Sequence, residues 1–308
     1  MLRIVAPLRA MGAAIDGREH GDRLPLAIRG ASLAAIDHET TIASAQVKTC
    51  ILLAGLNATG RTSVTEPVLS RDHTERMMAA AGIPISTTGT TVLVEGGHAP
   101  GAVDWHIPGD ISSALFFIVA ATMIAGSDLT LTGIGLNPTR TGALEILRSM
   151  GAALDVEIDE TIGGEPVGRI RARAAQLSGV EVTAQQIPSS IDEVPILAIA
   201  ATQAEGTTIF HGIGELRTKE SDRVAALAEG LTALGGAARL EGDSLVIEGP
   251  ARLGGGEVRS HGDHRIAMAF AIAGLVSSSP VKVTEWSCVD TSFPGFLDAL
   301  GRARGTGK

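Results

Sequence analysis

The sequence repeats one pattern of elements four times, and this repetition limits the possible folds more than any other feature. Each copy has a polar cluster, a long aliphatic helix, a strand, a polar loop and a second helix that stops at a glycine. The closing glycines are Gly82, Gly151, Gly235 and Gly301. They lie about 66 to 84 residues apart, which is longer than a solenoid unit and indicates duplicated βαβ-type subdomains.

The first helix of each copy is aliphatic on all sides, and a helix of this kind is buried. We expect these helices at residues 49–56, 114–125, 196–204 and 266–276, and the strands that follow them at residues 61–65, 129–132, 207–211 and 281–284. Each copy ends in a strand or hairpin, for example residues 91–94 and 245–248. The pattern predicts an α/β fold of βαβαββ repeats, in which the helices lie under sheets.

The copies divide unequally along the chain. Residues 108–308 hold three copies and are predicted to form a complete second lobe, after a hinge at residues 103–109. Residues 1–107 hold one complete repeat and half a unit, because RIVAPLRAMG at residues 3–12 matches only the closing helix of a copy. We therefore expect residues 1–107 to form an incomplete first lobe, truncated at its N-terminal side.

Composition and charge exclude several classes of function. The chain is 44% hydrophobic but only 3% aromatic, so its cores are aliphatic. The net charge of −9 disfavours nucleic acid and anionic membranes as partners. The apolar runs are too short to span a bilayer, no signal peptide is recognisable, and two cysteines are too few for a disulfide framework or a zinc site. We expect a cytoplasmic protein.

The most charged segment is GIGELRTKESDR, which precedes an apolar helix at residues 224–234. A helix N-terminus with nearby cations suits anion binding. On a helix, Lys219 and Arg223 would share a face at i and i+4, and Glu220 would project about 100° away. A solvated helix start with local ion pairs is the alternative interpretation.

Three other polar clusters also precede apolar helices: Ser44-Ala45-Gln46, Asp192-Glu193 and Gly262-Asp263-His264-Arg265. Each has a simple structural explanation, since Ser44 and Asp263 could act only as caps and both acidic residues of the second cluster are favoured by the helix dipole. For Glu193 we expect this dipole role alone.

Three charged residues have similarly simple interpretations. Lys48 is expected to be a solvated partner, and Arg71 could simply pair with Glu75. Arg140, in the turn NPTR, is structural or functional with equal weight.

Taken together, these segments resemble the 3-phosphoshikimate 1-carboxyvinyltransferase (EPSP synthase) family. The motifs that carry the resemblance are LPLAIRG, ASAQVKTCILLAGLN, SRDHTERM, GDISSA, NPTRTG, IDEVPILAIAA, ELRTKESDR, DHRIAM and TSFPGF. They cover nearly the whole chain in the family's order. The resemblance implies a two-lobed enolpyruvyl transferase fold, an inverse α/β barrel with the site between the lobes. The family's N-terminal phosphate-binding segment has no counterpart here.

The resemblance also implies roles for individual residues. On the shikimate 3-phosphate side it implies Ser44, Ala45, Gln46 and Arg71 as ligands, while Arg223 and Arg265 would hold the carboxylate of phosphoenolpyruvate. The implied catalytic residues are Asp192, Lys219 and Glu220. Asp192 would bind the 5-hydroxyl as proton acceptor with Lys219 beside it. Glu220 would give a proton to the methylene carbon and retake it.

The expected function is therefore transfer of the enolpyruvyl group from phosphoenolpyruvate to the 5-hydroxyl of shikimate 3-phosphate, with release of phosphate. No cofactor and no metal is implied, and a full-length protein is expected to be a monomer. Two alternatives remain open: a catalytically inactive fragment or remnant of such an enzyme, and an enolpyruvyl transferase acting on UDP-N-acetylglucosamine. The second lacks the SRDHTER, NPTRTG and KESDR motifs.

Overall fold

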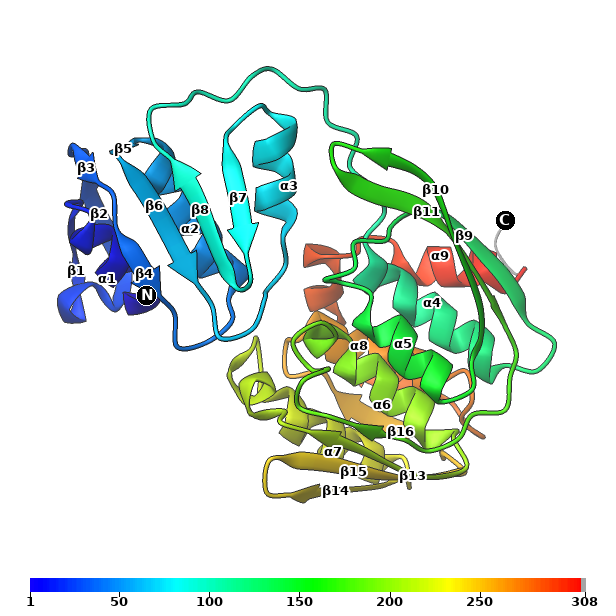
Figure 1. The fold of residues 1–308 in the computed structure, drawn as a ribbon. Helices are drawn as coiled ribbons and strands as arrows, with labels where there is room; N and C mark the ends of the chain where they lie inside the picture. Colours follow the sequence, from blue (N-terminus) through cyan, green and yellow to red (C-terminus); the bar gives the residue numbers. More distant parts are fainter. Residues whose placement is uncertain (306–308) are drawn as a thin grey trace. The chain divides into compact units, whose positions relative to one another are not determined.

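The computed structural model describes residues 1–305, which form two compact units (Figure 1). The first unit consists of Met1–Ile107 together with Thr161–Glu165. The second consists of Pro108–Glu160 and the described residues from Pro166 onward. Residues 98–108, where the hinge is predicted, form neither helix nor strand.

The first unit is built around α2 (Ala45–Leu56), which packs on a four-stranded sheet. The strand order of this sheet is β4 (Asp37–Glu39), β6 (Arg61–Thr65), β8 (Thr91–Glu95) and β7 (Ile85–Thr88), and only β4 and β6 are parallel. The remaining elements are α1 (Leu2–Ala10), α3 (His73–Ala80), the β1–β2 hairpin (Ala14–Arg18 and Arg23–Arg29), η1 (Glu19–Gly21) and the β3–β5 pair (Leu33–Ala34 and Ala58–Thr59). Its small core is aliphatic, with Ile51, Leu52, Val64 and Val92 fully buried.

The second unit has three inner helices that pack on one another: α4 (Ile111–Met123), α6 (Val194–Thr202) and α8 (His264–Ala273). Figure 1 shows α4 and α6 inside the unit, with strands outside them. Three further helices follow the strands: α5 (Gly142–Ser149), α7 (Arg223–Ala233) and α9 (Phe296–Ala303). Short 3-10 helices are η2 (Ile191–Glu193), η3 (Gly214–Thr218) and η4 (Trp286–Thr291).

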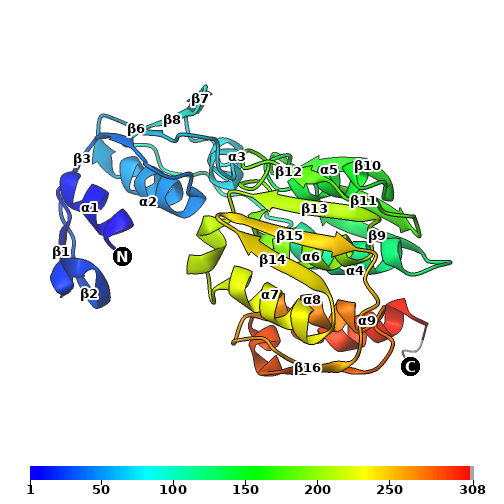
Figure 2. The same ribbon diagram turned by 90° about the horizontal axis from the view of Figure 1, so that it is seen from below.

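Three sheets cover these helices. The first has the order β10 (Ala153–Ile162), β11 (Glu165–Arg173) and β9 (Asp128–Gly135). The second has the order β12 (Glu181–Val182), β13 (Gly206–His211), β15 (Ser244–Gly249) and β14 (Ala237–Glu241), and Figure 2 shows its last three strands side by side. The third is the parallel pair β16 (Gly256–Arg259) and β17 (Val281–Thr284).

The inner helices are buried because of their composition. In α6, VPILAIAAT, every residue is buried, and α4 exposes almost nothing. Small residues let the helices of this unit approach closely: a Cβ atom at Gly230 of α7 would lie 2.2 Å from the ring of Phe270 in α8. No helix among residues 1–305 is long and apolar enough to cross a membrane.

The few aromatic residues are concentrated at one place in the second unit. Trp286, at the start of η4, lies on Phe296, with 6.1 Å between their rings, and Phe116, Phe117 and Phe293 surround the same Phe296. The other tryptophan, Trp105, belongs to the first unit and is 40% exposed.

The repeated elements occur where the sequence predicts them, with boundaries shifted by a few residues. The predicted inner helix 114–125 is α4 at Ile111–Met123, and 266–276 is α8 at His264–Ala273. In both helices a carboxylate caps the N-terminus earlier than the apolar run begins, so the helix starts sooner.

Candidate active site

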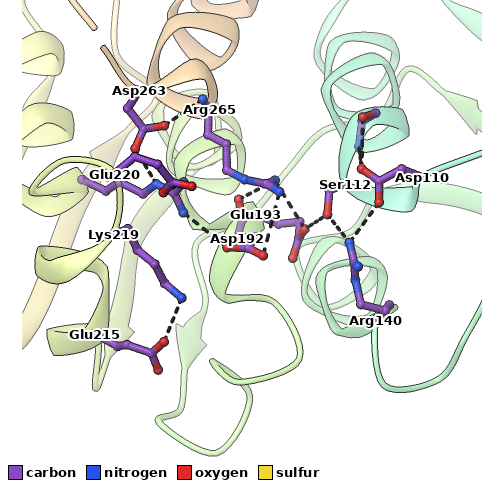
Figure 3. A network of polar contacts seen from close by, with 12 residues as sticks. Asp110, Ser112, Arg140, Asp192, Glu193, Glu215, Lys219, Glu220, Asp263 and Arg265 are labelled. Carbon is purple, nitrogen blue, oxygen red and sulfur yellow. Dashed lines mark hydrogen bonds and ion pairs between the residues drawn. The ribbon is translucent and has the colours of Figure 1, made fainter. Parts of the chain in front are cut away.

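Each inner helix of the second unit begins at a carboxylate. Asp110, Glu193 and Asp263 are the N-cap residues of α4, α6 and α8. Asp110 accepts a hydrogen bond from the backbone N–H of Ser113 (3.1 Å), and Asp263 accepts one from that of Arg265 (2.9 Å). Figure 3 shows that the three carboxylates belong to one connected network. Three partly positive helix ends therefore open onto the same site.

Arg223, the first residue of α7, is the centre of this network. Its side chain is 1% exposed and lies between three carboxylates. Its Nε donates to Asp263 (2.8 Å), and its two terminal nitrogens donate to Asp192 (3.3 Å) and Glu220 (2.5 Å). Of these partners Glu220 is 52% exposed and Asp263 is fully buried. An anion that binds to Arg223 would therefore replace Glu220 before it replaced Asp263.

Arg265, in the first turn of α8, is the more accessible guanidinium. Its Nη1 donates to the backbone oxygen of Asp192 (3.2 Å), and its Nη2 lies 3.8 Å from the Asp192 carboxylate. Its side chain keeps 16% of its surface exposed. The pKa of the adjacent His264 is lowered, chiefly by partial burial and then by the charge of Arg265. The ion pairs of Arg265 are long and part of its surface is exposed, which suits an anion-binding group.

Glu193 is a second buried carboxylate of the network, beside Asp263. It is 3% exposed, accepts a hydrogen bond from the Ser112 hydroxyl and lies 3.9 Å from Arg265 Nη1. Burial raises its pKa, against the opposing charge of Arg265 and the bond from Ser112. The expectation of a dipole role alone is too narrow, because Glu193 is packed between Ser112 and Arg265.

Arg140 continues the network at its far end. It follows the turn that starts at Asn137, and its Nη2 donates to Ser112 Oγ (2.6 Å) and to Asp110 Oδ1 (3.0 Å). The side chain is 15% exposed. The motif NPTR thus places a third guanidinium at the N-terminal ends of the inner helices.

Lys219 and Glu220 do not lie on a helix, which corrects the predicted geometry of the charged segment. The turn η3 ends at Thr218, Lys219 has extended backbone angles (φ −77°, ψ −152°), and α7 starts only at Arg223. The helix starts late because the carboxylate of Asp222 caps it by accepting from the Ala225 N–H. Lys219 and Arg223 therefore do not share a helical face.

The side chain of Lys219 has a local partner. Its Nζ lies 2.8 Å from Glu215 Oε1, and the lysine keeps 24% of its surface exposed. Asp192, Lys219, Glu220 and Arg265 nevertheless lie together in the second unit (Figure 3), and Arg223 bonds to Asp192 and Glu220.

The predicted shikimate-side residues all lie in the first unit. Ser44 is the N-cap of α2, and Ala45 and Gln46 are in its first turn. Ser44 makes no side-chain cap bond, so its hydroxyl is not used as the simple capping interpretation requires. The Gln46 side chain accepts a bond from Arg3 (3.1 Å), and Arg71 follows in the loop before α3.

Lys48 is buried, contrary to the expected solvated position. It is 0% exposed, and its Nζ lies 3.0 Å from Glu66 and 2.7 Å from Glu75. Glu75 is thus an ion-pair partner of Lys48. The sequence reasoning missed this triad, the role of Ser112 and the burial of Glu193; for the triad, a lysine in the mostly apolar helical run QVKTCILL was the available signal.

No group of three or more His, Cys, Asp and Glu within residues 1–305 is arranged to hold a metal ion. The polar network described above is instead composed of paired cations and carboxylates.

The comparisons with known proteins define the class first. The fold is that of the enolpyruvyl transferases: the enolpyruvyl transferase NikO from Streptomyces tendae superposes with a TM-score of 0.79 at 19% identity, over 98% of this chain and 70% of that one. The EPSP synthase from Acinetobacter baumannii superposes with a TM-score of 0.90 at 45% identity, over the same shares of the two chains. The predicted fold class is confirmed.

The sequence comparisons define the family. The family model of EPSP synthase (3-phosphoshikimate 1-carboxyvinyltransferase) matches residues 1–300. A 3-phosphoshikimate 1-carboxyvinyltransferase from Alkalilimnicola ehrlichii is 50% identical over 98% of this chain and 68% of its own length. One from Geobacter sulfurreducens is 47% identical over 98% of this chain and 70% of its own length. The chain belongs to the EPSP synthase family, and the predicted resemblance is confirmed.

Proposed function

We propose that this protein transfers the enolpyruvyl group of phosphoenolpyruvate to the 5-hydroxyl of shikimate 3-phosphate and releases phosphate, a step in aromatic amino-acid biosynthesis. Family membership over residues 1–300 supports the reaction class. The observation that carries the proposal to this chain is the network at the three inner helix ends. It combines accessible guanidinium groups for a carboxylate with separate carboxylates for two proton transfers.

Arg265 and Arg223 are proposed to hold the carboxylate of phosphoenolpyruvate. Arg265 has exposed surface, and its ion pairs with Asp192 and Glu193 are long, at 3.8 and 3.9 Å. Arg223 can contribute when Glu220 leaves its Nη2. A guanidinium that exchanges an internal carboxylate for a substrate carboxylate keeps its charge paired throughout. Substrate binding would thereby release Glu220.

The proton transfers are assigned to three residues. Asp192, with Lys219 beside the hydroxyl, is proposed to accept the proton of the 5-hydroxyl as its oxygen bonds to C2 of phosphoenolpyruvate. Glu220, in its protonated form, gives a proton to C3, which becomes a methyl group. When the bond from C2 to the phosphate oxygen breaks, Glu220 takes one methyl proton back and the double bond forms again. Glu220 suits this role because it is the most exposed of Arg223's partners.

The shikimate side is proposed to use Ser44, Ala45 and Gln46 at the start of α2, and Arg71. A helix N-terminus has unpaired N–H groups and a favourable dipole for phosphate, and a forked guanidinium matches phosphate oxygens. The net charge of −9 disfavours nucleic acid as a partner, so we propose that small anionic substrates are held by local clusters of cations. We propose a monomer in the cytoplasm.

A phosphate-release assay on the purified chain tests the function. Phosphoenolpyruvate and shikimate 3-phosphate together should release phosphate, and omission of either should abolish it. UDP-N-acetylglucosamine in place of shikimate 3-phosphate should give none. Phosphate release with UDP-N-acetylglucosamine as the only effective acceptor would identify the other transferase. No phosphate release with either acceptor would favour an inactive fragment.

A further inference from the structure

Two separate segments of the first unit carry the residues proposed to bind shikimate 3-phosphate. One is the start of α2 with Ser44, and the other is the loop between β6 and α3 with Arg71. Neither segment is held by its own hydrogen bonds alone: Ser44 makes no side-chain cap bond, and the loop contains no helix or strand. Some other group must fix the distance between them.

The carboxylate of Glu66 joins the two segments. Its Oε1 accepts the backbone N–H of Ser44 at 2.9 Å. Its Oε2 accepts both the N–H (3.1 Å) and the hydroxyl (2.8 Å) of Ser70, the residue before Arg71. The backbone of Glu66 follows directly on β6, and its N–H donates to Thr90 O, in the turn between β7 and β8, at 3.0 Å. One buried side chain therefore sets both segments relative to the sheet.

Lys48 holds this carboxylate in place. Its Nζ lies 3.0 Å from Glu66 Oε2, 2.7 Å from Glu75 Oε1 and 3.5 Å from the Ser70 carbonyl oxygen. The Lys48 and Glu66 side chains are 0% exposed, and Glu75 is 10% exposed. The second oxygen of Glu75, Oε2, is buried without a hydrogen-bond partner.

A triad of this kind is a poor device for stability alone. Burying charges requires their desolvation, which often cancels the attraction between them, and apolar residues of the same size are frequently as stable. The triad also contains one more carboxylate than cations, and one carboxylate oxygen stays unpaired. What the triad does provide is a fixed geometry at Ser44 and Ser70.

We infer that Glu66 is a positioning residue for shikimate 3-phosphate: it holds Ser44 and the Arg71 loop at the separation the ligand needs, and Lys48 orients it. The inference rests on the proposed function for its ligand. Glu66 does not itself bind the substrate, because its oxygens are occupied by Ser44, Ser70 and Lys48.

Glu66→Gln and Glu75→Gln form a matched pair of variants. Both remove one negative charge from the same triad at nearly constant volume, and both leave Lys48 one carboxylate partner. Only Glu66→Gln replaces a carboxylate oxygen that accepts hydrogen bonds from Ser44 or Ser70. The NH2 group that takes its place cannot accept a hydrogen bond. A purely stabilising role of the triad predicts similar effects for the two variants.

Three measurements are made on the full chain. Amide hydrogen exchange of Ser44 and Ser70 should be faster in Glu66→Gln than in wild type and unchanged in Glu75→Gln. Calorimetry should show shikimate 3-phosphate binding weakened roughly 10- to 100-fold in Glu66→Gln, as expected for a misplaced binding group, and close to wild type in Glu75→Gln. In turnover assays of Glu66→Gln the KM for shikimate 3-phosphate should rise, while the KM for phosphoenolpyruvate should remain unchanged.

Each result decides one part of the inference. Unchanged exchange in Glu66→Gln would overturn the positioning role. Faster exchange with unaltered affinity, or equal losses of affinity in both variants, would overturn its connection to the ligand. If wild type itself does not bind shikimate 3-phosphate, the proposed function and the ligand named here fail together, and exchange alone still decides whether Glu66 positions the two segments.

Discussion

Arg223 Nη1 donates a hydrogen bond to Asp192 Oδ1 at 3.3 Å, and this bond joins the proposed carboxylate clamp to the proposed proton acceptor. Arg223 is 1% exposed and Asp192 is 15% exposed, so the bond lies largely away from solvent. Binding of a substrate carboxylate to Arg223 should therefore change the hydrogen bonding of Asp192.

Glu220→Gln should lower turnover by a factor of roughly 10² to 10⁴ with little change in substrate binding, because glutamine cannot give or retake the methylene proton. Steady-state kinetics and calorimetry measure the two quantities. Glu229→Gln, an exposed change on α7, is the control. Turnover near wild type in Glu220→Gln would remove this residue from the mechanism.

Arg265→Ala should weaken phosphoenolpyruvate far more than shikimate 3-phosphate, because the proposed phosphate ligands of the latter, Ser44 and Arg71, lie on the first unit. Calorimetry with each substrate in turn compares the two losses. Arg259→Ala, whose side chain is 61% exposed, controls for the removal of a positive charge. Equal losses for both substrates would mean that the assignment of sides is wrong.

Lys48→Met should destabilise the protein by about 3–5 kcal/mol, because it leaves the carboxylates of Glu66 and Glu75 buried without their cation. The free energy of unfolding is measured by urea titration with circular dichroism. Lys282→Met removes a lysine that is 73% exposed and should have little effect. A loss as small as that of the control would show that Lys48 is not buried in solution.

The free energy of unfolding of Glu193→Gln, relative to that of wild type, should increase as pH rises. Burial raises the pKa of Glu193 in the folded protein. Below about pH 4 residue 193 is protonated in both the folded and the unfolded wild-type chain. At higher pH the unfolded chain loses this proton more readily than the folded one, so the wild-type free energy of unfolding falls. Glutamine stays neutral at every pH.

Urea titrations at several pH values give the difference between Glu193→Gln and wild type. Glu257→Gln, at a site 60% exposed, serves as the comparison. A difference that does not change with pH would show that Glu193 has no raised pKa in the folded state.

Much of the fold could be predicted because the same pattern of elements occurs several times in the sequence. The aliphatic helices carry no polar face, so their burial follows from residue type alone. Their boundaries could not be predicted as well: α4 begins at Ile111 because Asp110 caps it, three residues before the expected start of 114. The cap is a single side-chain hydrogen bond, and the apolar pattern does not contain it.

The roles of the predicted site residues stay predictions, but their predicted geometry can be compared with the structure. Arg223 bonds to Asp192 and Glu220, and Arg265 bonds to Asp192, all within the second unit. The helical spacing of Lys219 and Arg223 failed because Asp222 delays the start of α7. Lys48 was misplaced because its partners are distant in sequence, and helical periodicity reports only local neighbours.

The two tryptophans lie in different units, and this gives the protein two optical reporters. The chain contains no tyrosine, so Trp105 and Trp286 should dominate its near-ultraviolet emission. Trp105 is 40% exposed in the first unit, whereas Trp286 packs on Phe296 in the second. Replacing either one by phenylalanine would leave a single fluorophore, so that each unit's unfolding could be followed separately in the same molecule.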